Sequence, residues 1–455
     1  MIKSVKLSRR DFLKRTASIA GAAFAIPAIV PSTVFGANVP SSRITMGCIG
    51  LGGQGTWNML GFLNNPDVQV VALCDVNAGS DDYDMLYQFK GSSSAGLQHA
   101  IDRARKATAE SFIGFDTYSD FRDLLARDDI DTVTVCTPDH WHALVSIAAA
   151  KAGKDIYCEK PLANSVAEGR AVCDAVKRYG RILQTGSHER SNDSARFACE
   201  LVRNGRIGKI HTVHVSMPTN EPHHDTLRSR FKPQPVTPVP EGLDYDMWLG
   251  HTPQVPYIRA RCHFWWRFNH TYGGGEMTDR GAHVLDIVQL GLNTDDTGPV
   301  EIAGCGNAPK EGVYNAFMEF NFECKYANGV RLIGKSQGTR GIKFEGTDGW
   351  IFVHIHGGRL EAQPQSLLRE TIGPNEIHLG RSPGHHQDFI NAVKSRGTTI
   401  ATPEIGHRTA SLCHLINIAM LRGRKLNWDP KMEKFTNDDI ANKMLTPTMR
   451  PPWHL

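Results

Sequence analysis

The chain has 455 residues and a formal net charge of +4, and residues 1–36 alone hold six Lys or Arg and one Asp. The remainder is near neutral, which gives no support for binding to nucleic acid or to an anionic membrane. Its length predicts two domains and a sizeable core.

The N-terminal segment has the pattern of an export signal. Residues 8–14 (Ser-Arg-Arg-Asp-Phe-Leu-Lys) form a twin-arginine signature, and the apolar stretch 17–30 is too short to span a membrane stably. We expect residues 1–37 to be a twin-arginine signal peptide, removed on export to the periplasm, with no membrane contact afterwards. An uncleaved anchor is the alternative. Since this route exports folded protein, the ten scattered Cys predict neither disulfides nor a zinc cluster.

A dinucleotide-binding pattern begins at residue 44. An apolar run over 44–49 leads to Gly50-Leu51-Gly52-Gly53-Gln54-Gly55, a helix-like segment follows over 57–63, and a second apolar run over 68–73 precedes Asp75. In such a unit, Gly50 makes the tight turn, Gly52 lets backbone approach the pyrophosphate, and Gly55 lets the helix pack closely. Asp75 is placed to accept both ribose hydroxyls and to repel a 2′-phosphate, so NAD is expected rather than NADP. The competing interpretation is a glycine-rich turn without function.

Alternating strands and helices continue to about residue 186. After a polar loop over 77–96, strands are expected at 131–137, 156–158 and 182–185, with helices at 121–126, up to 152 and at 166–178. This predicts a parallel α/β sheet whose ligands lie beyond the carboxyl ends of its strands. The cofactor-binding candidates at those ends are Gly50, Leu51, Gly52, Gln54, Gly55, Asp75, Thr137, His140, His142, Glu159 and Lys160. The two histidines are expected to shape the nicotinamide pocket rather than to bind a metal.

From residue 187 the pattern becomes that of an antiparallel sheet. A helix is expected at 195–203 and a strand at 210–217, followed by a long Pro- and His-rich loop over 218–240. Polar alternation predicts further strands at 317–322, 330–335 and 350–355, and helices at 385–394 and 411–422 close the chain. The predicted domains are therefore residues 43–186 and 187–455.

A second chemical motif lies at Gly273-Gly274-Gly275-Glu276-Met277-Thr278-Asp279-Arg280-Gly281-Ala282-His283. With Thr278 as the N-cap, Asp279, His283 and Asp286 would share one helix face. Asp279 could then orient the His283 ring and raise its basicity, which suits proton transfer from a sugar hydroxyl. The alternative is that Asp279 only complements the helix dipole and His283 is a core residue.

Three segments resemble the glucose–fructose oxidoreductase/inositol dehydrogenase (Gfo/Idh/MocA) family. They are Ile-Gly-Leu-Gly-Gly-Gln-Gly at 49–55, Cys-Thr-Pro-Asp-His-Trp-His at 136–142 and Cys-Glu-Lys-Pro-Leu at 158–162. The resemblance covers nearly the whole chain after the signal. It implies an N-terminal Rossmann domain and a C-terminal α/β domain with a large, mostly antiparallel open sheet. It also implies a homo-oligomer through that sheet and a small carbohydrate substrate.

The resemblance also implies roles for single residues, because the family's D-x-x-x-H motif matches Asp279 and His283. Lys160 would contact the substrate hydroxyl and the ribose, either as a base or by electrostatic positioning. His283 would be the main acid/base, with Asp279 as its partner. An aromatic and basic patch just before the motif would face sugar C–H surfaces or pack in the core; it comprises Arg261, His263, Trp265, Trp266 and Arg267. The adjacent pairs at 223–224 and 385–386 do not by themselves make a chelating face, so no metal is expected.

Three functions are compatible with these residues. The first is an exported NAD(P)-dependent oxidoreductase that transfers hydride at a carbinol carbon of a sugar, polyol or glycoside. The second is an NAD-dependent glycoside hydrolase or lyase that oxidises C3 transiently and eliminates the C1 substituent. A non-catalytic sugar binder is disfavoured by the intact Lys160, Asp279 and His283. Because the periplasm maintains no NAD pool, the sequence favours tightly bound NAD that is recycled within each turnover.

Overall fold

The computed structural model describes residues 43–84, 88–108, 114–436 and 438–455, and the predicted signal peptide over 1–37 lies outside them. Residues 44–455 form one compact unit. No helix in the described part of the chain combines the length and apolar character that crossing a membrane requires.

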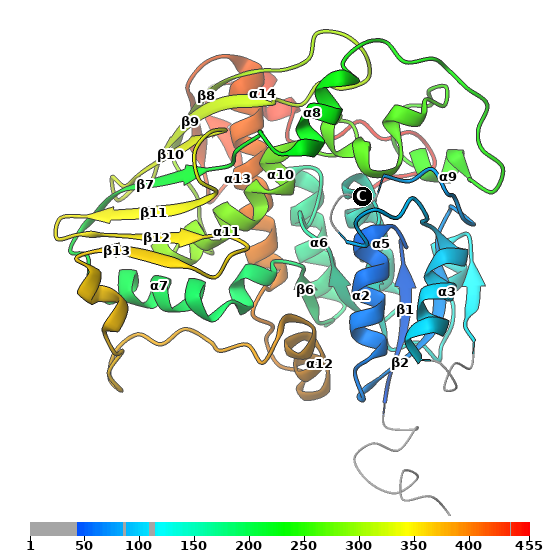
Figure 1. Ribbon diagram of the computed structural model, residues 1–455, viewed down its shortest axis with the longest axis horizontal. Helices are drawn as coiled ribbons and strands as arrows, with labels where there is room; N and C mark the ends of the chain where they lie inside the picture. Colours follow the sequence, from blue (N-terminus) through cyan, green and yellow to red (C-terminus); the bar gives the residue numbers. More distant parts are fainter. Residues whose placement is uncertain (1–42, 85–87, 109–113, 437) are drawn as a thin grey trace, which may run out of the picture. The chain divides into compact units, whose positions relative to one another are not determined.

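Six parallel strands form the first sheet, in the order β3-β2-β1-β4-β5-β6 (Figure 1). Their bounds are β1 Ile44–Ile49, β2 Val68–Cys74, β3 Asp116–Tyr118, β4 Thr132–Val135, β5 Asp155–Cys158 and β6 Leu183–Thr185. The predicted parallel sheet is confirmed. The strand order reverses between β1 and β4, and in such sheets the ligand crevice opens beyond the carboxyl ends at this point.

Helices cover both faces of this sheet. One face packs against α2 (Gly53–Leu63) and α3 (Leu97–Thr108), and the other packs against α4 (Phe121–Leu125), α5 (Asp139–Lys151) and α6 (Val166–Arg178). Helix α2 begins four residues before the predicted 57. The sequence did not predict α3, because the residues it buries, Ala100 and Ala104, are small and give only a weak apolar signal.

The second sheet has nine strands in the order β13-β12-β11-β7-β10-β9-β8-β14-β15, and only β7 and β10 pair in parallel. This confirms the large, mostly antiparallel sheet. Its strands are β7 Ile210–Ser216, β8 Glu301–Asn307, β9 Glu319–Lys325, β10 Arg331–Lys335, β11 Gly341–Gly346, β12 Trp350–His354, β13 Leu360–Gln363, β14 Leu426–Asp429 and β15 Lys434–Thr436. Sequence patterns identified β7, β9, β10 and β12 only.

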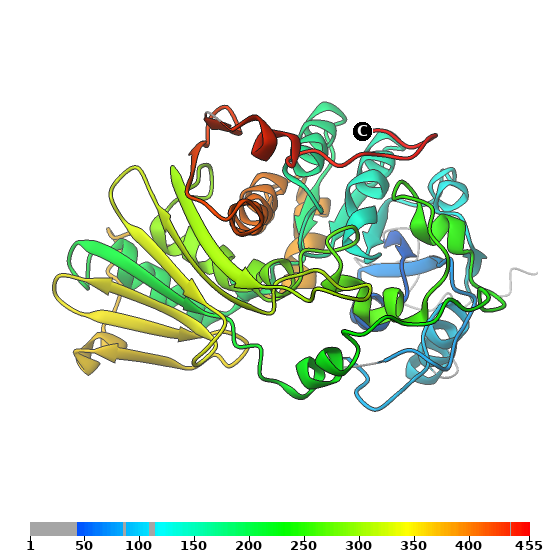
Figure 2. The same cartoon turned by 90° about the horizontal axis from the view of Figure 1, so that it is seen from above.

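One face of the second sheet is covered and the other is open. Helices α7 (Asp193–Arg203), α11 (Gly281–Leu292) and α13 (Pro403–Arg422) pack against one face and enclose the larger core (Figures 1 and 2). Strand β9 shows the result, since its residues alternate strictly between exposed and buried. Helix α13 begins eight residues before the predicted 411.

The remaining elements connect the two halves. The region expected to be a loop over 218–240 contains helix α8. Helix α12, from the later part of the chain, returns to the first half, where its Phe389 packs on Phe62 of α2 with ring centroids 6.0 Å apart. The other helices are α8 Pro222–Ser229, α9 Tyr245–Leu249, α10 Glu276–Asp279, α12 His385–Ser395 and α14 Asp439–Lys443, with short 3-10 helices η4 His188–Ser191, η5 Arg259–Arg261, η6 His263–Phe268 and η7 Gln365–Arg369.

Buried histidines make the fold sensitive to acid. Burial lowers the pKa of His140 and His385 to about 3, and that of His251, His386 and His414 to about 4, from an ordinary 6.5. The unfolded chain therefore takes up protons near pH 6.5 while the folded rings stay neutral, so stability is present above pH 6.5 and is lost as the pH falls towards 4. Since one pKa unit corresponds to about 1.4 kcal/mol, we expect a loss of several kcal/mol.

Urea unfolding across this pH range measures the effect. The buried carboxyls of Asp139 and Glu168 act in the opposite direction, because burial raises their pKa to about 8 and about 7 and so favours the folded state at low pH. They are outnumbered by the histidines. If the urea concentration at the midpoint of unfolding is the same or higher in acid than above pH 6.5, the expected loss of stability is contradicted.

Candidate functional site

A pocket of about 440 Å³ lies at the carboxyl ends of β1 and β4 and extends towards α10 and α11. Residues from both halves of the chain line it. Of the residues predicted from sequence, it brings together Gly50, Leu51, Gly52, Gln54, Gly55, Asp75, Thr137, His142, Glu159, Lys160, Asp279 and His283.

The glycine turn has the close packing that a dinucleotide site needs. Gly50 adopts a φ of +84°, and a Cβ there would lie 2.6 Å from the carbonyl carbon of Cys136. A Cβ on Gly55 would lie 1.9 Å from the carbonyl oxygen of Gly50. Helix α2 follows the turn directly, and the first N–H groups of a helix have no partner within it and favour an anion.

Asp75 follows β2 and supports the glycine turn. Its carboxylate accepts hydrogen bonds from the backbone N–H of Leu51 at 2.5 Å and of Asn77 at 2.8 Å. Burial raises the pKa of Asp75 to about 6, although these two N–H groups oppose the rise. The side chain is thus fixed at the pocket wall, next to the turn that would hold the pyrophosphate.

Replacing Asp75 by Ala should weaken NAD binding and reduce discrimination against NADP, because the carboxylate that would accept the ribose hydroxyls is removed. Dissociation constants for both nucleotides, measured by calorimetry, test this. Unchanged affinity for NAD together with continued exclusion of NADP would contradict the role of Asp75.

Glu159 links the end of β5 to helix α2 by hydrogen bonds. Its carboxylate accepts from Asn58 at 2.8 Å, from Gln54 at 3.2 Å and from the backbone N–H of Lys160 at 3.1 Å. Asn58 was missed by sequence reasoning because a polar residue on an apolar helix face carries no signal until its partner is known.

Lys160 and Asp279 join the two halves of the chain inside the pocket. The Lys160 Nζ lies 2.6 Å from Asp279 Oδ1 and 3.0 Å from the Asp279 carbonyl oxygen. Arg267 Nε lies 3.5 Å from the same carboxylate oxygen. Burial would raise the pKa of Asp279, but the positive charges of Lys160 and Arg267 outweigh it and hold the pKa well below its ordinary value.

Helix α10 ends at Asp279 and α11 begins at Gly281, and Arg280 between them also has helical backbone angles. Asp279 and His283 both line the pocket, and their shared helix face stays a prediction. Thr278 is not an N-cap, since it lies inside α10 and Gly275 precedes that helix. The Asp279 carboxylate is engaged with Lys160.

His283 is a buried, neutral imidazole at the pocket wall. It is 5% exposed, and its Nδ1 has no hydrogen-bond partner within the described residues. Burial, followed by the charges of His188 and Lys160, lowers its pKa well below the ordinary value. The imidazole is therefore held in its neutral form. Its neighbours are the rings of His188 and His356, with centroids at 4.5 Å and 4.7 Å.

The structure does not bring His140 to the pocket. Its Nε2 lies 2.9 Å from the Trp248 carbonyl oxygen, and its ring packs against those of Trp248 and Tyr272. His142 does line the pocket; its Nδ1 lies 2.6 Å from the Pro161 carbonyl oxygen and its Nε2 lies 2.9 Å from that of Thr137.

Some residues of the aromatic and basic patch line the pocket, and others pack in the core. His263, Trp266 and Arg267 line the pocket. Trp265 is core, 1% exposed, and donates through Nε1 to Asp84 at 2.5 Å. Arg261 donates to the Pro256 carbonyl oxygen at 2.6 Å, and the pocket-lining set does not include it.

The pocket residues that were not proposed from the sequence include His188, Arg280, Arg340 and His356, whereas Asp139 lies in the stretch 137–142 expected at this crevice. Burial raises the pKa of Asp139 to about 8. His188 follows β6, so the rule that ligands lie beyond the carboxyl ends of strands could have found it. His356 lies in the turn after β12, where no signal in the sequence marks it.

Two groups of described residues have the composition and spacing to hold a metal ion, although none is expected from the sequence. One comprises His188, His283 and His356, and the other comprises His223, His224 and Glu276. In the second group His224 Nε2 lies 2.7 Å from Glu276, and Arg280 Nε lies 3.3 Å from the same carboxylate. His223 and His224, although adjacent in sequence, therefore both face the carboxylate of Glu276.

Two curated proteins show the range of relatives. The levoglucosan dehydrogenase of Pseudarthrobacter phenanthrenivorans is 27% identical over 272 residues, which are 55% of this chain and 60% of that protein. A glycosyl hydrolase family 109 protein of Solibacter usitatus is 34% identical over 166 residues, 36% of this chain and 35% of that protein. The chain thus spans less than two thirds of the length of either relative.

A solved structure shares the fold. Levoglucosan dehydrogenase in complex with NADH and levoglucosan superimposes with a TM-score of 0.57 and 18% identity, covering 85% of this chain and 99% of that one.

Family models match both halves of the chain. "Oxidoreductase family, NAD-binding Rossmann fold" matches residues 44–187, and "Oxidoreductase family, C-terminal alpha/beta domain" matches residues 194–455, which is more than half of the chain. With both models matched in order, the chain belongs to the Gfo/Idh/MocA family of oxidoreductases.

Proposed function

We propose that the protein is an exported NAD-dependent oxidoreductase that transfers hydride at a carbinol carbon of a sugar, polyol or glycoside. The observation that carries this proposal is the 2.6 Å contact between Lys160 and Asp279 in the same pocket as the glycine turn. This contact holds a hydrogen-bond donor in the pocket that the dinucleotide would enter, and His283 lines the same pocket.

The residues of the pocket fit a dinucleotide. The space beside Gly50 and Gly55 is too tight for a Cβ, and the N-terminus of α2 follows the turn, so a pyrophosphate can approach backbone N–H groups. Asp75 would hold the adenosine ribose, and Glu159 and Lys160 would lie towards the nicotinamide end. When bound, the nicotinamide supplies the hydride acceptor or donor.

Oxidation of an alcohol requires that its O–H proton leaves as the C–H hydride departs. Lys160 would donate a hydrogen bond to the substrate oxygen and hold it, while Asp279 fixes the ammonium group. His283, neutral because of its buried position, would accept the proton. Asp279 then acts by positioning Lys160 rather than by orienting His283.

The relatives support a carbohydrate substrate and leave two reaction types. Similarity to a levoglucosan dehydrogenase favours net oxidoreduction. Similarity to a glycosyl hydrolase family 109 protein over 166 residues favours the second candidate, an NAD-dependent glycoside hydrolase. Both reactions would begin with hydride transfer in the same pocket, so Lys160 and His283 would serve either one.

The proposed export supports a tightly held cofactor. The Arg9-Arg10 signature stands on the same chain as a complete dinucleotide fold, and NAD is not replenished outside the cytoplasm. We therefore expect turnover on sugars or glycosides without added NAD and without accumulation of free NADH.

Absorbance of NADH during turnover, with product analysis in deuterated water, tests this expectation. Stoichiometric release of NADH with each product would leave an ordinary dehydrogenase. Solvent deuterium at C2 of a cleaved sugar, without net NADH, would establish the eliminating glycosidase.

Membership of the family supports a homo-oligomer through the open face of the nine-stranded sheet. In β9 this face carries Glu319, Asn321, Glu323 and Lys325, so polar contacts would join a second copy there. Light scattering of the purified protein measures the assembly, and a monomer at all concentrations would contradict it.

A further inference from the structure

Three histidines from separate parts of the chain meet at one side of the pocket. His188 lies in η4 after β6, His283 in α11, and His356 in the turn after β12. One ring nitrogen of each lies within 4.8 Å of the others. We propose that this cluster is a binding site for a divalent transition-metal ion, with Zn²⁺ as the expected ion, and that its fourth position opens into the pocket.

The distances suit such an ion after a small movement. Zinc binds imidazole nitrogen at about 2.0–2.1 Å, so in a tetrahedral site the nitrogens lie roughly 3.4 Å apart. The cluster would have to contract by up to about 1.4 Å from the 4.8 Å limit. His283 is held on a buried helix, but the side chains of His188, at the start of η4, and His356, in a turn, are 47% and 32% exposed, so they can move towards it.

Buried polar atoms without partners point to the same site. His283 Nδ1 and Glu189 Oε2 are both buried and have no hydrogen-bond partner within the described residues. Leaving such atoms unsatisfied is costly, and a bound ion would satisfy the ring nitrogen.

Glu189 provides the outer support that metal-bound histidines usually have. Its Oε1 lies 3.7 Å from His188 Nε2 and 3.8 Å from His356 Nε2, and it accepts from the His356 backbone N–H at 3.2 Å. A carboxylate that accepts from the second ring nitrogen fixes the orientation of a liganding histidine. Arg340 Nη1 lies 3.3 Å from His356 Nδ1 and would have to move aside for that nitrogen to bind the ion.

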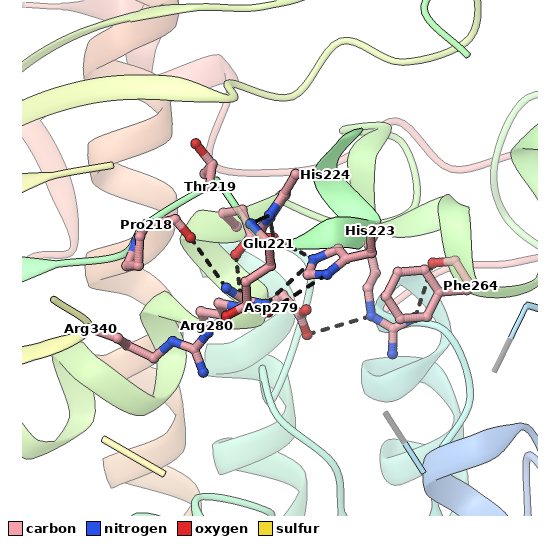
Figure 3. Close-up of polar contacts among 12 residues, drawn as sticks. Pro218, Thr219, Glu221, His223, His224, Phe264, Asp279, Arg280 and Arg340 are labelled. Carbon is pink, nitrogen blue, oxygen red and sulfur yellow. Dashed lines mark hydrogen bonds and ion pairs between the residues drawn. The ribbon is translucent and has the colours of Figure 1, made fainter. Parts of the chain in front are cut away.

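The second histidine group of the structure is less suited to an ion, because its ring nitrogens and its carboxylate already have partners. His224 is held at both ring nitrogens, since Nδ1 accepts from the Glu221 backbone N–H at 3.1 Å and Nε2 faces Glu276 at 2.7 Å. Arg280, which Figure 3 shows reaching Pro218 and Glu221, also neutralises Glu276 at 3.3 Å. Glu276 Oε2 has no hydrogen-bond partner within the described residues, but Arg280 already pairs with the carboxylate and both ring nitrogens of His224 are engaged.

The metal site goes beyond the proposed hydride transfer and does not depend on it. An ion and a proton would compete for the lone pair of His283, so a bound ion would polarise a hydroxyl in the pocket instead of the ring accepting its proton. Metal content can be measured without any substrate, and therefore a failure of the proposed function leaves this test intact.

The experiment compares two histidines of the same hairpin. His356 has a φ of +65°, a conformation that Asn tolerates, so His356→Asn should fold normally. The matched control is His354→Asn, two residues earlier, whose ring faces Glu361 at 2.9 Å and lies outside the cluster. His224→Asn tests the second group.

Each full-length variant is stripped with a chelator, titrated with Zn²⁺ and examined with Co²⁺, whose absorption spectrum reports tetrahedral coordination. We expect one ion per chain in the wild type, in His354→Asn and in His224→Asn, and loss of that binding in His356→Asn. Glu189→Gln should weaken binding by about 10–100-fold. No stoichiometric binding by the wild type, unchanged binding by His356→Asn, or loss only in His224→Asn would each overturn the proposal.

Discussion

Replacing Lys160 by Met should lower turnover by about 10²–10⁴-fold, because the group that holds the substrate oxygen is removed. The substitution also leaves Asp279 without its closest cation, at 2.6 Å, and breaking a buried ion pair typically costs about 3–5 kcal/mol. Arg267, 3.5 Å from the same carboxylate, should reduce that cost. Turnover and thermal unfolding are measured on the same preparations.

A double variant separates chemistry from folding. In Lys160→Met with Asp279→Asn, the negative charge is removed together with its partner, so unfolding temperature should recover relative to the single Lys160 variant. Turnover should stay low. If turnover recovers along with stability, Lys160 has a structural role only and the proposed mechanism is wrong.

Replacing His283 by Gln should also lower turnover by about 10²–10⁴-fold while NAD stays bound. The ring is the only neutral base that the mechanism uses, and Gln keeps a polar side chain of similar size without a basic nitrogen. The measurement is made on chelator-treated enzyme, so that loss of a metal ion does not contribute.

His251→Gln is the matched control for this substitution. His251 is buried, its Nδ1 likewise has no partner within the described residues, and burial lowers its pKa to about 4, but it is not among the pocket-lining residues. Its variant should keep near-normal turnover. Near-normal turnover in His283→Gln would transfer the proton-accepting role to Lys160.

The sequence was sufficient to predict the positions of site residues that belong to one strand–turn–helix unit or follow one strand. The turn at Gly50–Gly55, Asp75 after β2 and Lys160 after β5 lie where the alternation of strands and helices places them. Fixed spacing within a strand–turn–helix unit determines such positions, so one segment of sequence is enough to predict them.

The sequence was insufficient where a side chain's role depends on a distant partner. Asp279 faces Lys160, 119 residues away, and no local pattern marks that contact. His140 follows the same strand as His142, yet the start of α5 turns it away from the pocket. His356 comes from a hairpin turn that no motif marks.

Identification of the nucleotide released when the purified protein is denatured tests the central claim, that this pocket holds NAD for hydride transfer. Gly55→Val serves as the comparison, because a Cβ at that position would lie 1.9 Å from the Gly50 carbonyl oxygen and close the turn to a pyrophosphate. We expect NAD or NADH in near-equimolar amount from the wild type and none from Gly55→Val. Release of NADP alone, or equal retention by Gly55→Val, would contradict the account.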